Sequence, residues 1–348
     1  MAYAHSMTTR RQGKSGQAAG ELELIERIRG RVQALGRGGR GGLRLSIGDD
    51  CALLGVKPGE DVAVTTDLSL DGRHFRLDWH PAEAVGHRTL ARGLSDLAAM
   101  GARPVAAFLS LGLPPELTRG LRGQKPWVER FYDGLLALAE AHETPLAGGD
   151  LAESPLALAD IVLVGAVPTG KALKRSGARA GDGIYVTGRL GGAALGLELL
   201  SQSEGKRRRQ AHPELETALG PHLYPQPRLE QGQTLRRRGL ATAAMDLSDG
   251  LSMDLPRLCG ESGVAAEVDA ALVPCFPGAT LEQALNGGED YELLFTARAG
   301  VRMPRAIAGV PVTRIGEIVA RRKGQATVTL VRAGKKTPLT AGGWEHFG

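Results

Sequence analysis

Leu94-Ser95-Asp96-Leu97-Ala98-Ala99-Met100-Gly101-Ala102 places one acidic residue inside a run that is otherwise small and apolar. The run closes a helical pattern over Pro81 to Met100, which stops at Gly101 with Pro104 just beyond. A carboxylate in such a helix needs a partner, because burying an unpaired charge is costly. A divalent cation or a salt bridge to a nearby arginine such as Arg92 would each supply one, and the pattern favours the cation.

Five further acidic clusters stand beside small residues at the ends of expected strands. They are Gly48-Asp49-Asp50, Thr65-Thr66-Asp67, Gly148-Gly149-Asp150, Asp246-Leu247-Ser248-Asp249-Gly250 and Gly287-Gly288-Glu289-Asp290. A lone Asp after a strand is usually a turn former or a helix cap. Six clusters in one chain instead indicate carboxylates that converge on a hard cation such as Mg²⁺, because without it they would repel one another. The neighbouring glycines would let the backbone approach a phosphate closely.

Strand and helix patterns alternate without a strict βαβ rhythm. Strands are expected at 43–47, 62–66, 105–113, 161–167, 184–187, 242–245, 291–296 and 312–319, and helices at 22–28, 81–100, 126–142, 192–200 and 251–259. The mixture favours a two-domain α/β and α+β fold with mixed sheets flanked by helices. We expect a disordered tail over 1–19, an N-terminal domain over 20–168 and a C-terminal domain over 169–348. Within the second domain, 201–227 is expected to be a long surface loop with partial helix.

Composition and cysteine usage exclude several classes of function. The formal net charge of +5 sits partly in basic patches such as 206–209 and 236–238, but none is interleaved with aromatic residues, so nucleic-acid binding is not expected. No stretch approaches the roughly 18 apolar residues of a membrane span. Cys51, Cys259 and Cys275 show no CxxC pairing, which favours reduced thiols in the cytoplasm over a zinc site or a disulfide framework.

The phosphate-binding motifs of the common kinases do not occur in the sequence. There is no GxxxxGK[ST] loop, and neither an HRD nor a DFG motif. Gly36 to Gly41 matches GxGxxG by count, but no expected strand precedes it and no helix follows. A serine hydrolase is disfavoured because GxSxG is missing, and a glycosidase because no aromatic sugar platform lies near the acids. The sequence therefore favours metals held by carboxylates, with Arg175 either an added phosphate clamp or an exposed loop residue.

In order and spacing, these motifs resemble the thiamine-monophosphate kinase family. The resemblance runs from about Gly20 to Phe347 and rests on 47–54 IGDDCALL, 65–67 TTD, 74–75 HF, 94–102 LSDLAAMGA, 148–150 GGD, 175–177 RSG, 246–251 DLSDGL and 288–293 GEDYEL. Taken singly, the GGD and DLSDG pieces are also similar to the wider superfamily of aminoimidazole ribonucleotide synthetase, selenophosphate synthetase and a hydrogenase-maturation protein.

The resemblance implies an aminoimidazole ribonucleotide synthetase-like fold, whose N-terminal domain forms a homodimer and whose C-terminal domain closes over the site. It implies an ATP-dependent kinase that converts thiamine monophosphate to thiamine diphosphate. The implied Mg²⁺ ligands are Asp50, Thr65, Thr66, Asp67, Asp96, Asp150, Asp246 and Asp249. The implied ATP contacts are Tyr132, Gly149, Asp150, Arg175 and Ser248, and the implied thiamine monophosphate contacts are His74, Glu289 and Trp344.

Some of these positions have physical support and others depart from the family pattern. The indole of Trp344 could stack on a cationic heteroaromatic ring, although it could also simply anchor the terminus. His74 is a substrate contact or an ordinary turn residue. The family usually has Asn where this chain has Gly93, and often Thr where this chain has Leu151. Both departures put the finer geometry beside the metal and nucleotide contacts in question.

The acceptor implied by the resemblance is itself a phosphate monoester, largely dianionic at neutral pH because its second pKa is about 6. It needs no general base, so we expect no single side chain to be an essential base. The alternatives are another ATP-dependent enzyme of the same superfamily and a non-catalytic nucleotide-binding protein.

Overall fold

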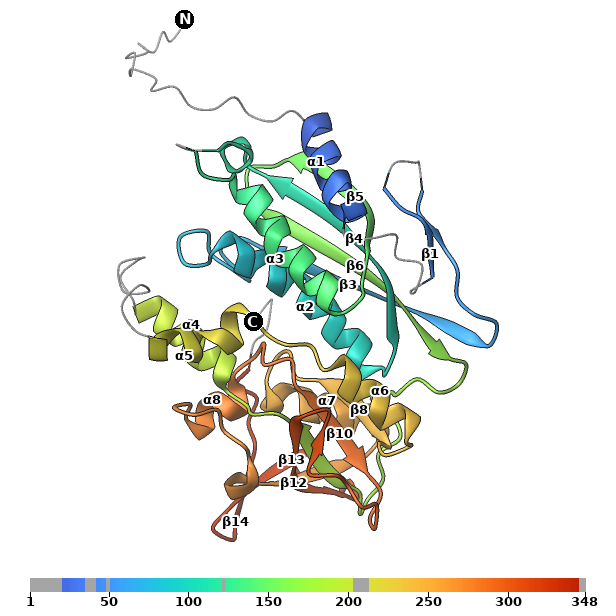
Figure 1. Cartoon of the computed structure of the whole chain (residues 1–348). Coiled ribbons are helices and arrows are strands. Elements are labelled where there is room, and N and C mark those ends of the chain that lie inside the picture. Colours follow the sequence, from blue (N-terminus) through green and yellow to red (C-terminus); the bar gives the residue numbers. More distant parts are fainter. Residues whose placement is uncertain (1–20, 35–41, 48–50, 121–122, 203–212, 344–348) are drawn as a thin grey trace, which may run out of the picture.

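The described residues build two large sheets, one from each half of the chain, with helices packed on them (Figure 1), and a small two-stranded sheet of β1 and β2. This computed structural model describes residues 21–34, 42–47, 51–120, 123–202 and 213–343. The expected tail, the 36–41 segment, Asp50 and Trp344 lie outside the described residues.

The first sheet has four strands in the order β3-β6-β4-β5. Its elements are α1 (Glu21–Ala34), β1 (Leu43–Leu45), β2 (Leu53–Leu54), β3 (Glu60–Leu70), α2 (Ala82–Ala99), β4 (Arg103–Leu113), a 3₁₀ turn (Pro115–Thr118), α3 (Trp127–Ala141), β5 (Leu146–Glu153) and β6 (Leu158–Pro168). Strand β4 runs parallel to β5, and the other pairs in this sheet are antiparallel. Strands β3 and β5 are therefore the two edges of the sheet.

The second sheet has eight strands, with β14-β13-β9-β12-β7-β10-β8 in order and β11 paired to β12. Its elements are β7 (Gly183–Thr187), α4 (Gly192–Gln202), α5 (Pro213–Leu223), α6 (Leu229–Arg237), β8 (Ala243–Asp246), α7 (Leu251–Ser262), β9 (Ala265–Asp269), a 3₁₀ turn (Ala270–Leu272), α8 (Leu281–Asn286), β10 (Leu293–Ala297), β11 (Ala306–Ile307), β12 (Val310–Val319), β13 (Val328–Arg332) and β14 (Lys335–Pro338). The expected mixed sheets flanked by helices are thus confirmed.

Every strand and helix expected from the sequence is present, but the structure also contains strands that the hydrophobic pattern did not predict. Strands β5, β9, β13 and β14 were not expected. The most consequential is β5, whose sequence Leu146-Ala147-Gly148-Gly149-Asp150 carries two glycines that weaken any strand signal. In the expected loop 201–227, α5 supplies the helical part.

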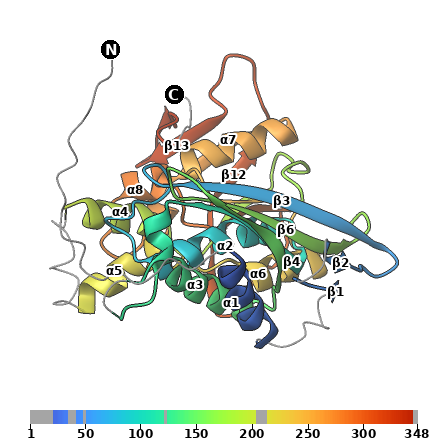
Figure 2. The ribbon, with the colours of Figure 1, turned by 90° about the horizontal axis from the view of Figure 1, so that it is seen from above.

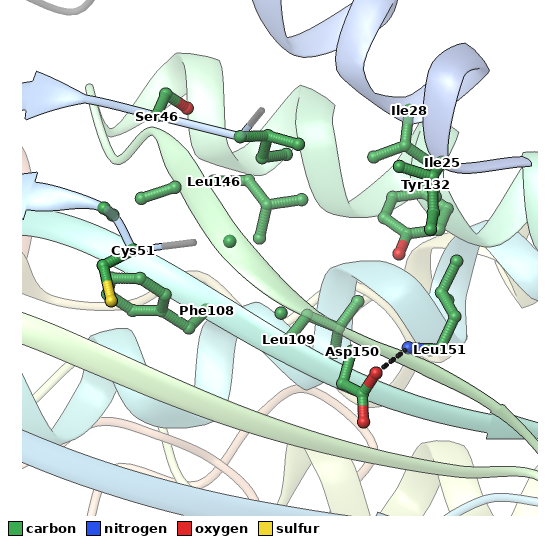
Figure 3. A pocket seen from close by; sticks show the side chains of 15 residues that line it. Ile25, Ile28, Ser46, Cys51, Phe108, Leu109, Tyr132, Leu146, Asp150 and Leu151 are labelled. Carbon is green, nitrogen blue, oxygen red and sulfur yellow. Dashed lines mark hydrogen bonds between the residues drawn. The ribbon is translucent and has the colours of Figure 1, made fainter. Parts of the chain in front are cut away.

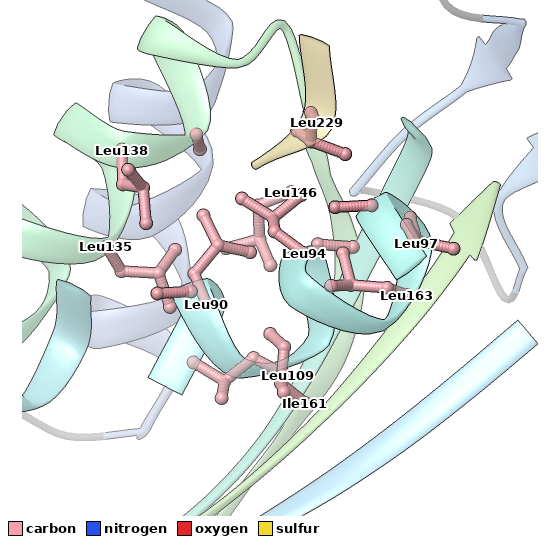
Figure 4. Packing of buried hydrophobic residues seen from close by; sticks show 14 of the residues in the cluster. Leu90, Leu94, Leu97, Leu109, Leu135, Leu138, Leu146, Ile161, Leu163 and Leu229 are labelled. Carbon is pink, nitrogen blue, oxygen red and sulfur yellow. The ribbon is translucent and has the colours of Figure 1, made fainter. Parts of the chain in front are cut away.

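The core forms around α2, whose apolar side faces the first sheet. Leu90, Leu94 and Leu97 are fully buried and pack with Leu109 of β4 and Leu163 of β6 (Figure 4). Burying each such side chain contributes about 1.5–3 kcal/mol. Helices α3 and α6 cover other parts of α2, as the view from above shows (Figure 2). Helix α2 is therefore enclosed on several sides.

The enclosure of α2 requires glycine at the crossing with α3. A Cβ added at Gly86 would lie 1.9 Å from the carbonyl oxygen of Phe131, and one at Gly134 would lie 1.9 Å from that of Glu83. The two helices consequently approach backbone to backbone, which no larger residue permits.

The opposite face of the first sheet is only partly covered. The hairpin of β1 and β2 packs Leu43 and Leu54 near Val105. Along β3, by contrast, Val62 and Val64 remain more than half exposed, at 54% and 62%. We call this uncovered area the open face.

We predict that Gly86→Ala and Gly30→Ala act in opposite directions, although both glycines lie in helices. Gly86→Ala forces α3 away from α2 and should lower the free energy of unfolding by about 1–3 kcal/mol or more. A Cβ at Gly30 meets nothing within 4 Å, so Gly30→Ala should raise the free energy of unfolding by up to about 1 kcal/mol. Urea denaturation of both variants measures this, and equal effects would contradict the close crossing.

Candidate functional site

Three acids that are at least partly buried, Asp67, Asp96 and Asp246, lie close together where α2 packs against β3 and β8. Side chains alternate along β3, so Thr65 and Asp67 face α2. The Thr65 hydroxyl donates a hydrogen bond to Asp96 of α2. The Ser95 hydroxyl donates to Oδ2 of Asp246, the last residue of β8, at 2.8 Å. Ser95 and Asp96, adjacent on one turn of α2, therefore contact Asp246 from the second half of the chain and Thr65 from the first half.

Burial and mutual repulsion make these acids hard to ionise together. Burial, followed by the Asp96 charge, raises the pKa of Asp67 to about 7 and the pKa of Asp246 to about 8. Burial also raises the pKa of Asp96. Carboxyl groups in this state attract a cation, because a cation offsets both the desolvation and the repulsion.

The carboxylate donors at this place fit Mg²⁺ better than a metal that takes all its ligands from protein side chains. The Asp67 Oδ2 atom is buried and accepts no hydrogen bond from the described residues, and Arg92 lies 3.6 Å from Asp67 Oδ1. Within the described ranges, no three His, Cys, Asp or Glu side chains converge on one metal position. Mg²⁺ commonly takes only one or two carboxylates and completes its shell with phosphate oxygens and water. The acids therefore fit Mg²⁺ bound together with a phosphorylated ligand.

The turn between β8 and α7 is organised by an acid that the sequence analysis missed. Asp254 Oδ2 accepts hydrogen bonds from the backbone N–H groups of Ser248 and Asp249, at 3.1 and 3.0 Å. Arg257 pairs with Asp249 and, at 2.9 Å, with Asp254. Asp249 is thus already neutralised by an arginine, whereas Asp96 and Asp246 form no ion pair within the described residues. The signal for Asp254 was its position in the first turn of α7.

One pocket of about 670 Å³ joins the three acids to two of the expected substrate contacts. It is lined by Asp67, Asp96, Asp246, Ser248 and Asp249, and also by His74, Phe75, Trp79, His222 and Glu289. The Leu70 N–H donates to His74 Nδ1 at 3.1 Å, which fixes the orientation of that imidazole. We call this the acidic pocket.

Glu289 is kept ionised inside the acidic pocket. Burial alone would raise its pKa, but the charge of Arg88, together with that of Arg92, lowers it to about 2. Arg88 Nη2 lies 2.7 Å from Glu289 Oε2. Glu289 also adopts a φ of +65°, an uncommon conformation for a residue with a side chain.

Three of the expected nucleotide contacts line a different pocket, of about 440 Å³, along the outer edge of β5 (Figure 3). Tyr132 is buried there, and Asp150 accepts a hydrogen bond from the Leu151 N–H at 2.9 Å. A Cβ at Gly149 would lie 1.9 Å from the carbonyl oxygen of Leu109, so the strand comes unusually close to β4 here. We call this the edge pocket.

The expected site residues therefore separate into two groups within one chain. Through the register of β4 with β5 and β6, Asp150 shares a face with Leu68, which belongs to the open face. Thr66 also points to the open face, away from Thr65 and Asp67. Arg175 is exposed, although its charge still acts on Asp96.

The departure at Gly93 lies in the core and not in either pocket. A Cβ at Gly93 would lie 2.4 Å from Leu163 Cδ1, so the side chain of Leu163 fills the space that a larger residue would need. Leu151 lines the edge pocket beside Asp150.

We predict that, without divalent metal, Asp246→Asn stabilises the protein at pH 8. The unfolded carboxyl ionises near its ordinary pKa of 3.8, but the folded one ionises at about 8. Wild-type stability is therefore lost as the pH rises between these values, and the amide avoids that loss. Thermal melting in EDTA at pH 4 and pH 8 measures it, with the exposed Glu261→Gln as control. A variant that melts below wild type at pH 8 would contradict the burial of an acid here.

Comparison with known proteins gives one consistent family. Residues 48–170 match the model of the AIR synthase related protein N-terminal domain, and residues 179–329 match that of its C-terminal domain.

No described helix is long and apolar enough to cross a membrane.

The chain is 40% identical to the thiamine-monophosphate kinase of Salmonella typhimurium over 343 residues, covering 95% of this chain and 99% of that protein. The crystal structure of thiamine-monophosphate kinase from Stenotrophomonas maltophilia is similar with a TM-score of 0.75 and 36% identity, over 92% of this chain and 99% of that one. The structure of AaThiL complexed with AMPPCP and TMP is similar with a TM-score of 0.70 and 29% identity, over 98% of this chain and all of that one. The chain therefore belongs to the thiamine-monophosphate kinase family.

Proposed function

We propose that this kinase transfers the γ-phosphoryl group of ATP to thiamine monophosphate in the acidic pocket, giving thiamine diphosphate and ADP. The observation that carries the proposal is the shared lining of that pocket. Carboxyl groups suited to a metal–phosphate complex, Asp67, Asp96 and Asp246, open into the same space as His74 and Glu289. We further propose that 20–168 and 169–348 act as two domains, because the pocket draws its lining from both.

The proposal includes Mg²⁺ held by Asp67, Asp96 and Asp246. When bound, Mg²⁺ neutralises and orients the phosphates of both substrates. The supporting observation is the raised pKa of all three acids, which a cation would reverse. Asp50, Thr66, Asp150 and Asp249 remain candidate ligands whose role depends on the assembled enzyme.

The transfer needs no side chain to accept a proton. An oxygen of the thiamine monophosphate dianion forms the new bond to the γ-phosphorus, and the bond from that phosphorus to the bridging oxygen breaks, leaving ADP. The chain's task is to hold two anions in line. Glu289 remains a carboxylate beside Arg88 and suits a contact with the cationic part of the acceptor, whereas Ser248 and Asp249 hold the turn at the end of β8.

We also propose that two copies associate through the open face. Val62, Val64 and Leu68 of β3 lie on one face of the strand and are 54%, 62% and 45% exposed, and they form an apolar area that a second copy would cover. The arrangement of the pockets supports this. Asp67 and Asp150 lie on opposite edge strands, about 14 Å apart by strand spacing, and on opposite faces. One nucleotide could contact both kinds of group only if a second copy supplies one of them.

The direct test is a product assay with ATP, Mg²⁺ and thiamine monophosphate, with thiamine as control acceptor. We predict equal amounts of thiamine diphosphate and ADP from thiamine monophosphate, and no transfer to thiamine. Asp96→Asn should lower kcat/KM at least about 100-fold, because it removes a carboxylate that would hold Mg²⁺, the ion that offsets the phosphate charge. Near-normal turnover of that variant at saturating Mg²⁺ would contradict the metal role.

We predict that a mixture of two inactive variants regains activity. Asp96→Asn damages the acidic pocket and Asp150→Asn the edge pocket. If each site is completed by the second copy, half of the dimers from balanced co-expression are mixed, and each has one intact site. Activity should then return to about a quarter of wild type. Activity no higher than that of the separate variants would place both acids in one chain's site, and full activity of Asp150→Asn alone would remove Asp150 from the site.

A further inference from the structure

Arg88 is a buried arginine that no sequence motif pointed to. It lies in α2, two turns before Asp96, and only 4% of it is exposed. An arginine in such a place must have its charge and its donors satisfied, because removing a guanidinium from water costs several kcal/mol. The hydrogen-bond partners of Arg88 therefore show which parts of the chain it connects.

The partners of Arg88 are the two described substrate contacts and a helix of the second half. Its Nη2 donates to Glu289 Oε2 at 2.7 Å and to the carbonyl oxygen of His74 at 3.3 Å. Its Nη1 donates to the carbonyl oxygen of His222 in α5 and lies 3.3 Å from His222 Nδ1. One rigid planar group thus connects three segments that are far apart in the sequence.

We propose that Arg88 is the positioning residue for the acceptor: it sets Glu289 and the 71–74 loop in a single geometry that selects the thiamine phosphate. The inference rests on the proposed function. Arg88 donates to Oε2 of Glu289, and none of the hydrogen bonds found among the described residues goes to Oε1. Glu289 lines the acidic pocket, so a ligand there can reach this side chain. The left-handed backbone of Glu289 is the kind of conformation that surrounding contacts must hold in place.

His222 and His80 complete the setting of Arg88. His80 Nε2 and His222 Nε2 lie 3.0 Å apart, so one ring donates and the other accepts. Burial and the neighbouring Arg88 charge lower the pKa of His222, which keeps that imidazole neutral. Arg88 is thus the cation that contacts Glu289 directly, at 2.7 Å, and its loss would leave the partly buried carboxylate to rearrange.

The alternative is that the Arg88–Glu289 pair merely stabilises the fold. A second arginine–carboxylate pair on α2, more exposed than the first, serves as control: Arg130 of α3 donates two hydrogen bonds, each 2.8 Å, to Glu83 of α2 and lines neither pocket. Replacing Arg130 by Met therefore reports what the loss of an arginine–carboxylate pair on α2 does to stability alone.

The test is steady-state kinetics of Arg88→Met, Arg88→Lys, Glu289→Gln and the Arg88→Met/Glu289→Gln double variant, with Arg130→Met as control. We expect Arg88→Met to raise KM for thiamine monophosphate about 10- to 100-fold, since a displacement of about 1 Å can cost that much. KM for ATP should stay within about twofold, and Arg88→Lys should restore part of the loss. The double variant should be no worse than the poorer single variant, because both changes damage one unit.

Four outcomes would overturn the inference. They are an unchanged KM for thiamine monophosphate in Arg88→Met, equal rises of KM for both substrates, additive effects of the two changes, and changes in Arg130→Met that match those of Arg88→Met. If Arg88→Met does not fold, Arg88→Lys can be tested instead: its KM for thiamine monophosphate should rise while its KM for ATP stays nearly unchanged. A wild-type enzyme that makes no thiamine diphosphate would overturn the proposed function and this inference together, whereas an active wild type with an unchanged KM for thiamine monophosphate in Arg88→Met overturns this inference alone.

Discussion

The close placement of three poorly solvated carboxyl groups, where α2 meets β3 and β8, is the constraint on which the rest of the molecule depends. Asp67, Asp96 and Asp246 come from three elements; the Thr65 hydroxyl donates to Asp96 and the Ser95 hydroxyl donates to Asp246. Such an arrangement is costly by itself, because each acid resists ionisation beside the others. It persists only if well-packed elements bring these residues together, and α2 provides that packing.

Helix α2 has two functions, and each belongs to one side of the helix: an apolar side packs in the core and a polar side serves the acidic pocket. Leu90, Leu94 and Leu97 bury one side against the first sheet. Asp96 lines the acidic pocket, and Arg88 donates a hydrogen bond to Glu289, which also lines it. The glycine crossing with α3 brings a second helix within backbone contact of α2. The side chains that hold the chemistry are therefore positioned by a helix that has little room to move.

The positions of these acids at one site could be expected from the sequence, because each acid is marked by its immediate neighbours. An acid within an apolar helix, as at Asp96, and an acid after a strand, as at Asp246, can be recognised from a few neighbours. The alternation of side chains along a strand is local too, and it alone separates Thr66 from Thr65 and Asp67. The face of Asp150, however, depends on the register of β5, a strand whose glycines hid it from the pattern. Arg88 and His222 are 134 residues apart, and no local pattern joins them.

The same contacts that assemble the acidic pocket also join the two halves of the chain. Ser95 to Asp246 and Arg88 to Glu289 both run from α2 to the second half, and both end on groups that line the pocket. A movement of the second half away from α2 would separate Asp246 from Asp96 and Glu289 from Arg88 in one step. The position of the second half and the charge state of the pocket are consequently linked, because a ligand that neutralises the acids also strengthens the attachment of the second half to α2.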